Sequence, residues 1–285
     1  MRRFKLLAGP FYISCILFVF MISCKPKKFI YKSPPHYNFS QGLPLKLDLR
    51  IMEISGVVWD NHKDEFIAHN DEKGTLFYLD KNNAGIVKEF QFSTSKGDYE
   101  DIAIAKNDVY VLRSDGMIYK IVTDSAGSQK YFDLGKIELS GVDFETLYYD
   151  PERNALIMLC KNCPSDDKKL VSAYAYYPDS IGFVNKPIYS IDVAKVKELS
   201  PRETSRFQPS AARIHPVLKK LFILSSASNQ LVITDMAGNV EGVYMLAKKL
   251  FPQAEGLTFK SNGEMFISNE GVSSKAVLLK FNYIP

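Results

Sequence analysis

The chain repeats a short motif at a spacing close to 45 residues. In each copy, small or acidic residues stand at the start of an apolar run. The copies are Ser55-Gly56-Val57, Glu100-Asp101-Ile102, Glu145-Thr146-Leu147, Ser210-Ala211-Ala212 and Glu255-Gly256-Leu257. Their central residues are 45, 45, 65 and 45 positions apart, so three intervals are equal and one is longer by 20. Periods of about 40–45 residues are typical of β-propeller blades. The repeat therefore predicts a ring of five similar units.

Each unit has the pattern of a four-stranded antiparallel meander. In the first unit, four short β-rich runs are separated by turns rich in Asn, Asp and Gly. These runs are Val57–Trp59, Phe66–His69, Leu76–Leu79 and Ile86–Phe90. Short strands between such turns at regular spacing indicate antiparallel sheets. No stretch has a sustained helical period, which argues against a helical solenoid.

The fifth unit ends at Pro285 before a fourth strand can form. The segment "LPLKLDLR" alternates in strand fashion from Leu43 to Leu49 and can supply the missing strand. Such closure removes the exposed edges of an open array. We therefore expect an all-β, five-bladed β-propeller over residues 43–285. The 20 extra residues before the fourth unit, around residues 193–208, should form a loop or short helix on one face.

The N-terminus has the pattern of an export signal. A basic start precedes 17 apolar residues from Leu6 to Ile22, and "MISC" ends at Cys24. This tetrapeptide is similar to the lipobox of bacterial lipoproteins, although Met21 is unusual at its first position. We expect a signal peptide over residues 1–23, lipidation of Cys24, a flexible tether over 24–42, and a membrane-anchored location in the bacterial cell envelope, periplasmic or surface-exposed. An uncleaved membrane anchor is the alternative.

Net charge and cysteine content argue against two kinds of function, nucleic-acid binding and zinc binding. Removal of residues 1–23 takes away Arg2, Arg3 and Lys5 and no acid, so the formal charge falls from +4 to +1. This balance does not suggest a nucleic-acid partner. The mature chain would keep only Cys160 and Cys163 beside the lipidated cysteine, in "CKNC". No second pair completes a zinc site, so a loop disulfide or two free thiols are expected.

The repeated acids predict a cation site. Innermost propeller strands run along the central channel, so equivalent positions meet as a ring. These positions are Ser55, Glu100, Glu145, Ser210 and Glu255. Clustered carboxylates repel one another unless a proton or cation neutralises them, and oxygen ligands suit Ca²⁺. Asp71 and Glu270 follow the second strands of the first and fifth units and should lie near the same face.

Two alternatives to a metal follow from the same residues. The glutamates could bond backbone amides of neighbouring blades or water in the channel. Arg113 and Lys161, which follow the second strands of units two and three, could instead pair with the acids.

Six ordered segments carry a resemblance to a known family. They are "EISGVVWD", "HNDEKGTLFYLD", "GDYEDIAI", "FETLYYDPERNALIML", "QPSAARIHP" and "QAEGLTF". Together they resemble the SdiA-regulated (YjiK-like) family of bacterial envelope proteins. This resemblance implies a five-bladed propeller distantly related to NHL-repeat proteins, with a calcium site and no established molecular function.

Three functions fit these patterns. The first is a non-enzymatic, membrane-tethered module that binds a protein or glycan, with Ca²⁺ ordering the channel mouth. The second is a calcium-dependent hydrolase, such as a lactonase or phosphoesterase, that uses the channel-mouth carboxylates. The third is an envelope protein whose metal serves stability only. The sequence has no G-x-S-x-G elbow and no glycine-rich phosphate loop, which favours the first.

Overall fold

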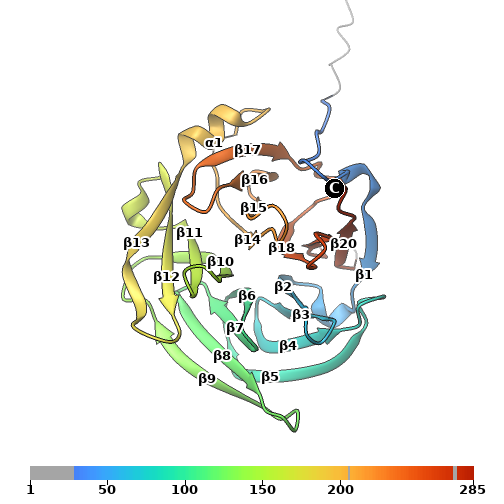
Figure 1. Cartoon of the computed structure of the whole chain (residues 1–285), viewed down its shortest axis with the longest axis vertical. Helices are drawn as coiled ribbons and strands as arrows, with labels where there is room; N and C mark the ends of the chain where they lie inside the picture. The colour runs from blue at the N-terminus through green and yellow to red at the C-terminus, as the bar shows by residue number, and fades with distance from the viewer. Residues whose placement is uncertain (1–28, 205, 272–274) are drawn as a thin grey trace, which may run out of the picture. The chain divides into compact units, whose positions relative to one another are not determined.

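Five four-stranded antiparallel sheets surround a central channel (Figure 1). The computed structural model describes residues 29–204, 206–271 and 275–285. The expected signal peptide and Cys24 lie outside these residues. Residues 31–285 form one unit, which contains all five sheets. The predicted five-bladed, all-β propeller is confirmed.

Every blade has the same strand order from the channel outward. The innermost strands are β2 (Ile54–Asp60), β6 (Tyr99–Ala105), β10 (Asp143–Asp150), β14 (Ala211–Ile214) and β18 (Ala254–Phe259). The second strands are β3 (Glu65–Asn70), β7 (Asp108–Arg113), β11 (Ala155–Asn162), β15 (Leu221–Ser225) and β19 (Met265–Asn269). The third strands are β4 (Lys73–Leu79), β8 (Met117–Thr123), β12 (Leu170–Tyr177), β16 (Gln230–Thr234) and β20 (Val277–Phe281). The outer strands are β5 (Ile86–Lys96), β9 (Gln129–Lys136), β13 (Gly182–Asp192), β17 (Val240–Met245) and β1 (Leu43–Lys46).

The ring closes between the two ends of the chain. β1 pairs antiparallel with β20, with Leu43 opposite Lys280 and Lys46 opposite Val277. The fifth blade therefore takes its outer strand from the N-terminal side, as its missing strand predicted. Inner strands of neighbouring blades contact one another all round the ring, and β18 of the last blade contacts β2 of the first.

The apolar core lies between neighbouring blades. Phe66 of blade one packs on Phe266 of blade five, with ring centroids 4.8 Å apart, and Trp59 packs on Phe66 at 4.7 Å. Comparable clusters of buried aliphatic and aromatic side chains fill the other interfaces. Because each blade buries both faces against its neighbours, the strands hold the channel residues at fixed positions.

The extra residues before the fourth blade form a helix and a loop. Helix α1 (Val193–Leu199) begins at Asp192, whose side chain accepts a hydrogen bond from the Ala194 amide at 2.7 Å. Within the helix, Val193 and Val196 are buried and Lys197 is exposed. No helix among the described residues is both long enough and apolar enough to cross a bilayer.

The packed body begins before the boundary expected at Leu43. Tyr37 and Phe39 are buried in the core cluster of the fourth and fifth blades, and Phe39 opens the short 3-10 helix η1 (Phe39–Gln41). The Tyr37 hydroxyl donates to the Gly263 carbonyl at 2.6 Å and lies 2.6 Å from Nε2 of His215. Two aromatics among polar residues carry too little periodicity to be recognised as core. Residues 37–42 therefore belong to the folded body and not to a flexible tether.

Candidate functional site

Three glutamates of the predicted ring sit at β-bulges in innermost strands. In β6, Tyr99 pairs with Arg113 while Asp101 pairs with Leu112, so Glu100 is the extra residue between them. Glu145 in β10 and Glu255 in β18 occupy the same kind of register break. A bulge locally redirects the strand and its side chains, and bulges are frequent next to binding sites. The bulges place equivalent carboxyl groups at one mouth of the channel.

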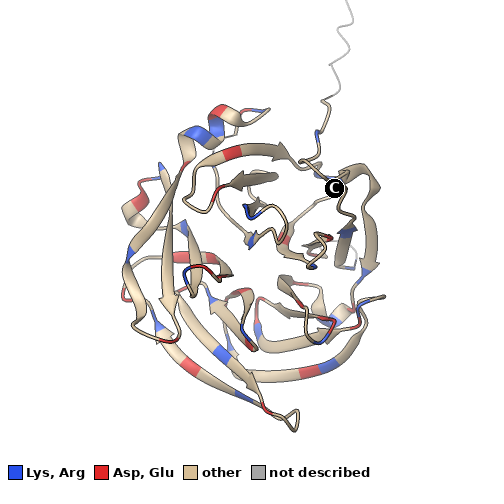
Figure 2. Ribbon diagram, viewed as in Figure 1, with Lys and Arg blue, Asp and Glu red and all other residues tan. Residues whose placement is uncertain are grey.

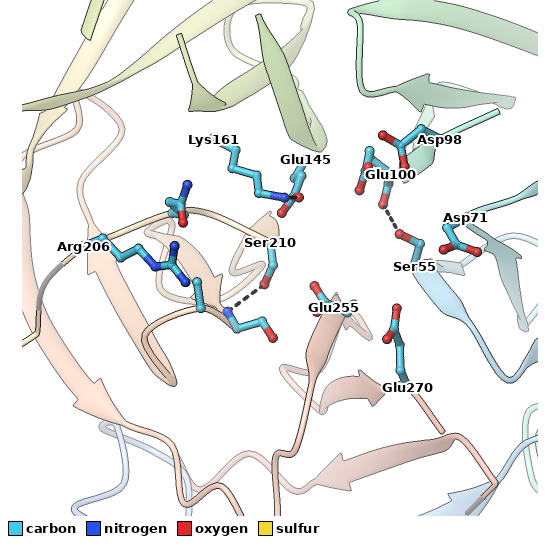
Figure 3. A pocket seen from close by; sticks show the side chains of 13 residues that line it. Ser55, Asp71, Asp98, Glu100, Glu145, Lys161, Arg206, Ser210, Glu255 and Glu270 are labelled. Atoms are coloured by element: carbon cyan, nitrogen blue, oxygen red, sulfur yellow. Dashed lines mark hydrogen bonds and ion pairs between the residues drawn. The ribbon is translucent and has the colours of Figure 1, made fainter. Parts of the chain in front are cut away.

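All five acids predicted as metal ligands line one cavity of about 470 Å³ (Figure 3). The predicted ring serines are there too, and four polar or charged residues that the motif search did not select join them. The lining residues are Ser55, Asp71, Asp98, Glu100, Glu145, Lys161, Arg206, Gln208, Ser210, Ser226, Ala227, Glu255 and Glu270. We call this cavity the acidic mouth.

The two ring serines tie neighbouring blades together. Ser55 Oγ donates to the Glu100 carbonyl at 3.0 Å, and Ser210 Oγ donates to the Ala254 carbonyl at 2.8 Å. Each bond links one inner strand to the next inner strand of the ring. The serines therefore hold the backbone beneath Glu100 and Glu255 in place.

Asp71, Glu255 and Glu270 form one group of acids in the acidic mouth without an ion pair to a base among the described residues. Burial raises the pKa of Glu255 to about 7, and the Glu270 carboxylate adds to this effect. Burial and the neighbouring Asp71 likewise raise the pKa of Glu270 to about 7. Burial also raises the pKa of Asp71, whose Oδ1 is buried without a hydrogen-bond partner among the described residues. Figure 3 shows these three side chains directed toward a shared space.

Glu100 lies beside Asp98 on another side of the acidic mouth (Figure 3). Burial, followed by the nearby Asp98 carboxylate, raises the pKa of Glu100 to about 9. This side chain therefore stays protonated at neutral pH unless a cation approaches. The "GDYED" segment contains three acids at different depths. Asp98 is exposed at the edge of the acidic mouth, Glu100 lies in the mouth, and Asp101 is buried in the channel.

Of the two bases that could pair with the ring acids, only Lys161 does so. Lys161 forms an ion pair with Glu145 and lies 3.9 Å from an oxygen of Asp143. Arg113 instead forms a two-pronged ion pair with Asp115, with nitrogen–oxygen distances of 2.8 and 2.9 Å. Glu145 is thus neutralised by the protein itself, which separates it from the other predicted ligands.

The chemistry of the remaining acids fits a cation that prefers oxygen ligands. Asp71, Glu255 and Glu270 supply carboxylate oxygens, one of them buried and unpartnered among the described residues, and burial together with neighbouring carboxylates raises their pKa values. Among the described residues, no three of the predicted acids have oxygens within 4.8 Å of one another. Binding would have to draw these carboxylates together.

The channel below the acidic mouth is crossed by one buried ion pair that the sequence did not reveal. Arg213 of β14 forms a two-pronged pair with Asp101 of β6, at nitrogen–oxygen distances of 2.9 and 3.1 Å. The same guanidinium donates to the backbone carbonyls of Val57, Ile102, Leu147 and Ala212. It therefore ties the inner strands of four blades. This pair therefore lies buried inside the channel, and neither of its residues lines the acidic mouth.

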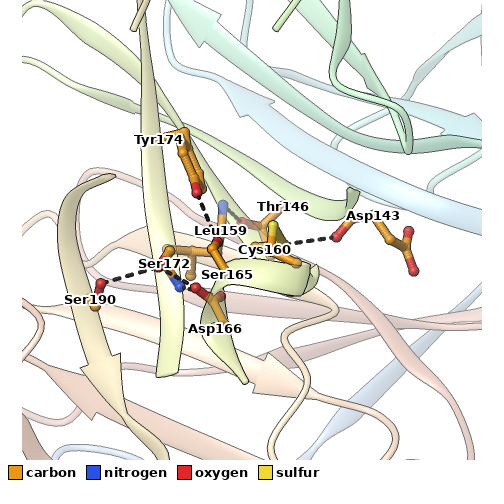
Figure 4. The surroundings of a disulfide bond; sticks show 10 residues. Asp143, Thr146, Leu159, Cys160, Ser165, Asp166, Ser172, Tyr174 and Ser190 are labelled. Carbon is orange, nitrogen blue, oxygen red and sulfur yellow. Dashed lines mark hydrogen bonds between the residues drawn. A yellow bond between two sulfur atoms is a disulfide. The ribbon is translucent and has the colours of Figure 1, made fainter. Parts of the chain in front are cut away.

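Cys160 and Cys163 are joined by a disulfide beside the acidic mouth (Figure 4). Their sulfurs and the Asp166 carboxylate lie within 4.8 Å of one another, a spacing that would suit a metal. However, the sulfurs are consumed by the disulfide, and both carboxylate oxygens of Asp166 accept hydrogen bonds from Ser172. We therefore exclude this cluster as a metal site in the oxidised protein.

The fold and the ordered motifs match one protein family. The model of the SdiA-regulated family matches residues 45–272. The chain belongs to the SdiA-regulated family. All five blades of this SdiA-regulated protein begin inside the matched segment, so the match includes the whole acidic mouth. No curated protein matches the chain.

Solved structures of three enzymes share the architecture. The glutaminyl cyclase of Myxococcus xanthus is 15% identical, with a TM-score of 0.57 over 85% of this chain and 96% of that one. A streptogramin B lyase is 12% identical, with a TM-score of 0.51 over 85% and 97%. A luciferin-regenerating enzyme is 10% identical, with a TM-score of 0.51 over 85% and 95%. At these identities the similarity shows the propeller fold alone.

Proposed function

We propose that this SdiA-regulated protein is a lipid-anchored, non-enzymatic binding module of the bacterial cell envelope whose acidic mouth binds Ca²⁺. The observation that carries the proposal is the cluster of Asp71, Glu255 and Glu270, three partly buried carboxyl groups with raised pKa values and no paired base. Such a cluster is costly to ionise alone and favourable to ionise around a cation. Ca²⁺ accepts about 6–8 oxygen ligands in flexible geometry.

The surrounding residues have separate roles in this proposal. Gln253 donates to Glu270 at 2.6 Å and orients one carboxylate, while Lys161 neutralises Glu145 and keeps it out of the cation's shell. When bound, Ca²⁺ supplies positive charge and open coordination positions for oxygen atoms of a protein or glycan ligand.

Calorimetric titration with Ca²⁺ tests the cation site. The sample is the lipid-free chain 25–285, stripped of metal, beside a Glu255→Gln/Glu270→Gln variant. The control is Glu241→Gln, which removes an exposed acid that pairs with Lys220 outside the mouth. Saturable binding that the double variant loses and the control keeps supports the site. Wild-type protein that is folded and binds no Ca²⁺ contradicts it.

The anchor is tested by changing Cys24. The wild-type protein expressed in a bacterial host should partition with membranes and incorporate a fatty-acid label, and Cys24→Ala should do neither. Membrane association that survives Cys24→Ala would indicate the uncleaved anchor instead.

The hydrolase alternative draws on one observation, the pKa of Glu100 near 9. A carboxyl group that stays protonated at neutral pH can act as a general acid. Lactones, aryl esters and phosphomonoesters are the substrates to screen with Ca²⁺ present. Turnover that Glu100→Gln abolishes without loss of Ca²⁺ binding would replace the non-enzymatic proposal with the hydrolase.

A further inference from the structure

A second cavity, of about 550 Å³, lies against the acidic mouth at the third and fourth blades. Its wall comes from two features that the proposed function leaves unused: the disulfide loop after β11 and the α1 segment before β14. The lining residues are Lys161, Asn162, Cys163, Asp166, Lys168, Leu170, Val193, Lys197, Arg206, Phe207 and Gln208. We call this cavity the basic pocket. Figure 2 shows basic positions on α1, which borders it.

Three of the four cations that line the basic pocket lack an acidic partner among the described residues. Lys168, Lys197 and Arg206 have no ion pair among the described residues. Their neighbours outside the lining are paired: Lys169 lies 2.9 Å from Asp167, and Lys195 lies 2.8 Å from Glu198. Three of the four cations of the lining are thus left without an ion pair in the described chain, whereas the fourth, Lys161, pairs with Glu145.

Asp166, the one acid among the described residues of the lining, forms no ion pair with these cations. Both oxygens of the Asp166 carboxylate are bound by Ser172, one by the backbone amide at 2.9 Å and one by the hydroxyl at 2.5 Å. Asp166 is buried and holds the loop to strand β12 (Figure 4). Its negative charge therefore serves the loop and leaves the lysines and the arginine of the pocket available.

The pocket is built on rigid supports. Cys163 is 6% exposed and disulfide-bonded, and Phe207 is 4% exposed in the cluster between the third and fourth blades. Val193 is buried at the start of α1. Charged side chains that project from anchored backbone lose less entropy on binding than side chains on loose loops.

We propose that the basic pocket binds an oxyanion, a phosphoryl or carboxylate group of a ligand. Arginine offers a planar fork of donors to such groups and lysine a point charge. Asn162 and Gln208 add side-chain amides that can donate to the same oxygens. Lys161, Arg206 and Gln208 line both cavities, so a ligand can reach from one to the other. The inference that the ligand of the acidic mouth carries this anionic group rests on the proposed function, because it assumes that the mouth binds a ligand. The inference that the basic pocket binds an oxyanion does not.

Calorimetric titration with inorganic phosphate and, separately, malonate tests the pocket. The sample is the lipid-free chain 25–285 in low-salt buffer without divalent ions. We expect saturable binding of at least one anion, weakened about 10- to 100-fold by Lys197→Ala/Arg206→Ala. The matched control is Lys195→Ala, on the same helix and outside the lining, which should leave the affinity unchanged. The anion that binds more tightly identifies the group as phosphoryl or carboxylate.

Two results would overturn the oxyanion pocket. One is the absence of saturable binding for both anions by folded protein. The other is an equal loss of affinity in the Lys195→Ala control, which would indicate attraction by general surface charge. Failure of the cation proposal has a different signature, because Ca²⁺ titration would then be flat while phosphate or malonate still binds. Phosphate or malonate binding retained in Glu255→Gln/Glu270→Gln supports the independence of the pocket.

Discussion

Arg213 reaches across the central channel to Asp101, and the two side chains form a buried, two-pronged ion pair between the fourth and second blades. Asp101 also accepts hydrogen bonds from the amides of Ile102 and Leu147, each at 2.8 Å. The pair therefore joins inner strands that are far apart in sequence. The Arg213 guanidinium also supplies hydrogen bonds to backbone carbonyls that point into the channel. A bound cation or water would otherwise have to satisfy these carbonyls.

Removal of one partner should strongly destabilise the propeller. Arg213→Met leaves Asp101 buried without its counter-charge and should lower the free energy of unfolding by about 3–5 kcal/mol. Urea denaturation followed by tryptophan fluorescence measures this loss. The double change Asp101→Leu/Arg213→Met should cost less than the sum of the two single changes, because no lone charge remains. Additive losses would contradict direct coupling across the channel.

Stability without metal should fall as the pH rises from about 4.5 to about 7. Glu255 and Glu270 have folded-state pKa values of about 7 against ordinary values of 4.5. In this pH window the folded state binds more protons than the unfolded state, so the free energy of unfolding decreases with pH. Thermal unfolding of metal-free protein at stepped pH measures the trend. Glu255→Gln/Glu270→Gln should make the slope shallower and leave the contribution of Glu100, whose folded-state pKa of about 9 acts in the same direction. An unchanged slope would show that other groups cause the trend.

The disulfide should stabilise the loop that contributes to the wall of the basic pocket. In the chain-entropy model, a loop this short contributes roughly 2 kcal/mol. Cys160→Ala/Cys163→Ala should therefore lower the free energy of unfolding by about this amount and weaken phosphate binding. Denaturation and phosphate titration of the oxidised protein and the variant measure both effects. Equal phosphate affinity in the two proteins would show that the loop holds its shape without the bond.

Phe39 should contribute to stability as a core residue. Its ring packs on Phe251 and Phe281, with centroids 5.2 and 4.9 Å apart. Phe39→Ala should cost about 3–5 kcal/mol, the range for a buried phenylalanine. Ile181→Ala, at a side chain that is 73% exposed, serves as the control and should have little effect. If the Phe39→Ala protein were as stable as the control, the interpretation of residues 24–42 as a flexible tether would be supported instead.

The fold followed from the sequence because it depends on a repeated local pattern. The 45-residue period, the turn residues and the alternation from Leu43 to Leu49 each reflect short-range constraints, and together they indicate five blades and their closing strand. Asp71 and Glu270 could be grouped with the ring glutamates because equivalent strand ends meet at one face. Register within a repeat was enough to assemble the acidic mouth.

Four other features depend on contacts that no period encodes. Arg213 is one residue of an ordinary strand, and its reach to Asp101 spans 112 positions. The bulges at Glu100 and Glu145 shift register by one residue, which alternation alone does not reveal. Arg206 lies in the irregular segment after α1 and lines both cavities only through tertiary packing. The sequence indicated Lys161 as a possible partner of the ring acids, but only the side-chain geometry shows that it pairs with Glu145.

Location of the cation in a crystal tests the central claim most directly. Crystals of the chain 25–285 would be grown near pH 8, soaked with CaCl₂, and measured at a long wavelength where calcium scatters anomalously. We expect one strong anomalous peak within coordinating distance of oxygens from Asp71, Glu255 and Glu270. An empty mouth in well-diffracting, soaked crystals, or a peak held only by other residues, would contradict it.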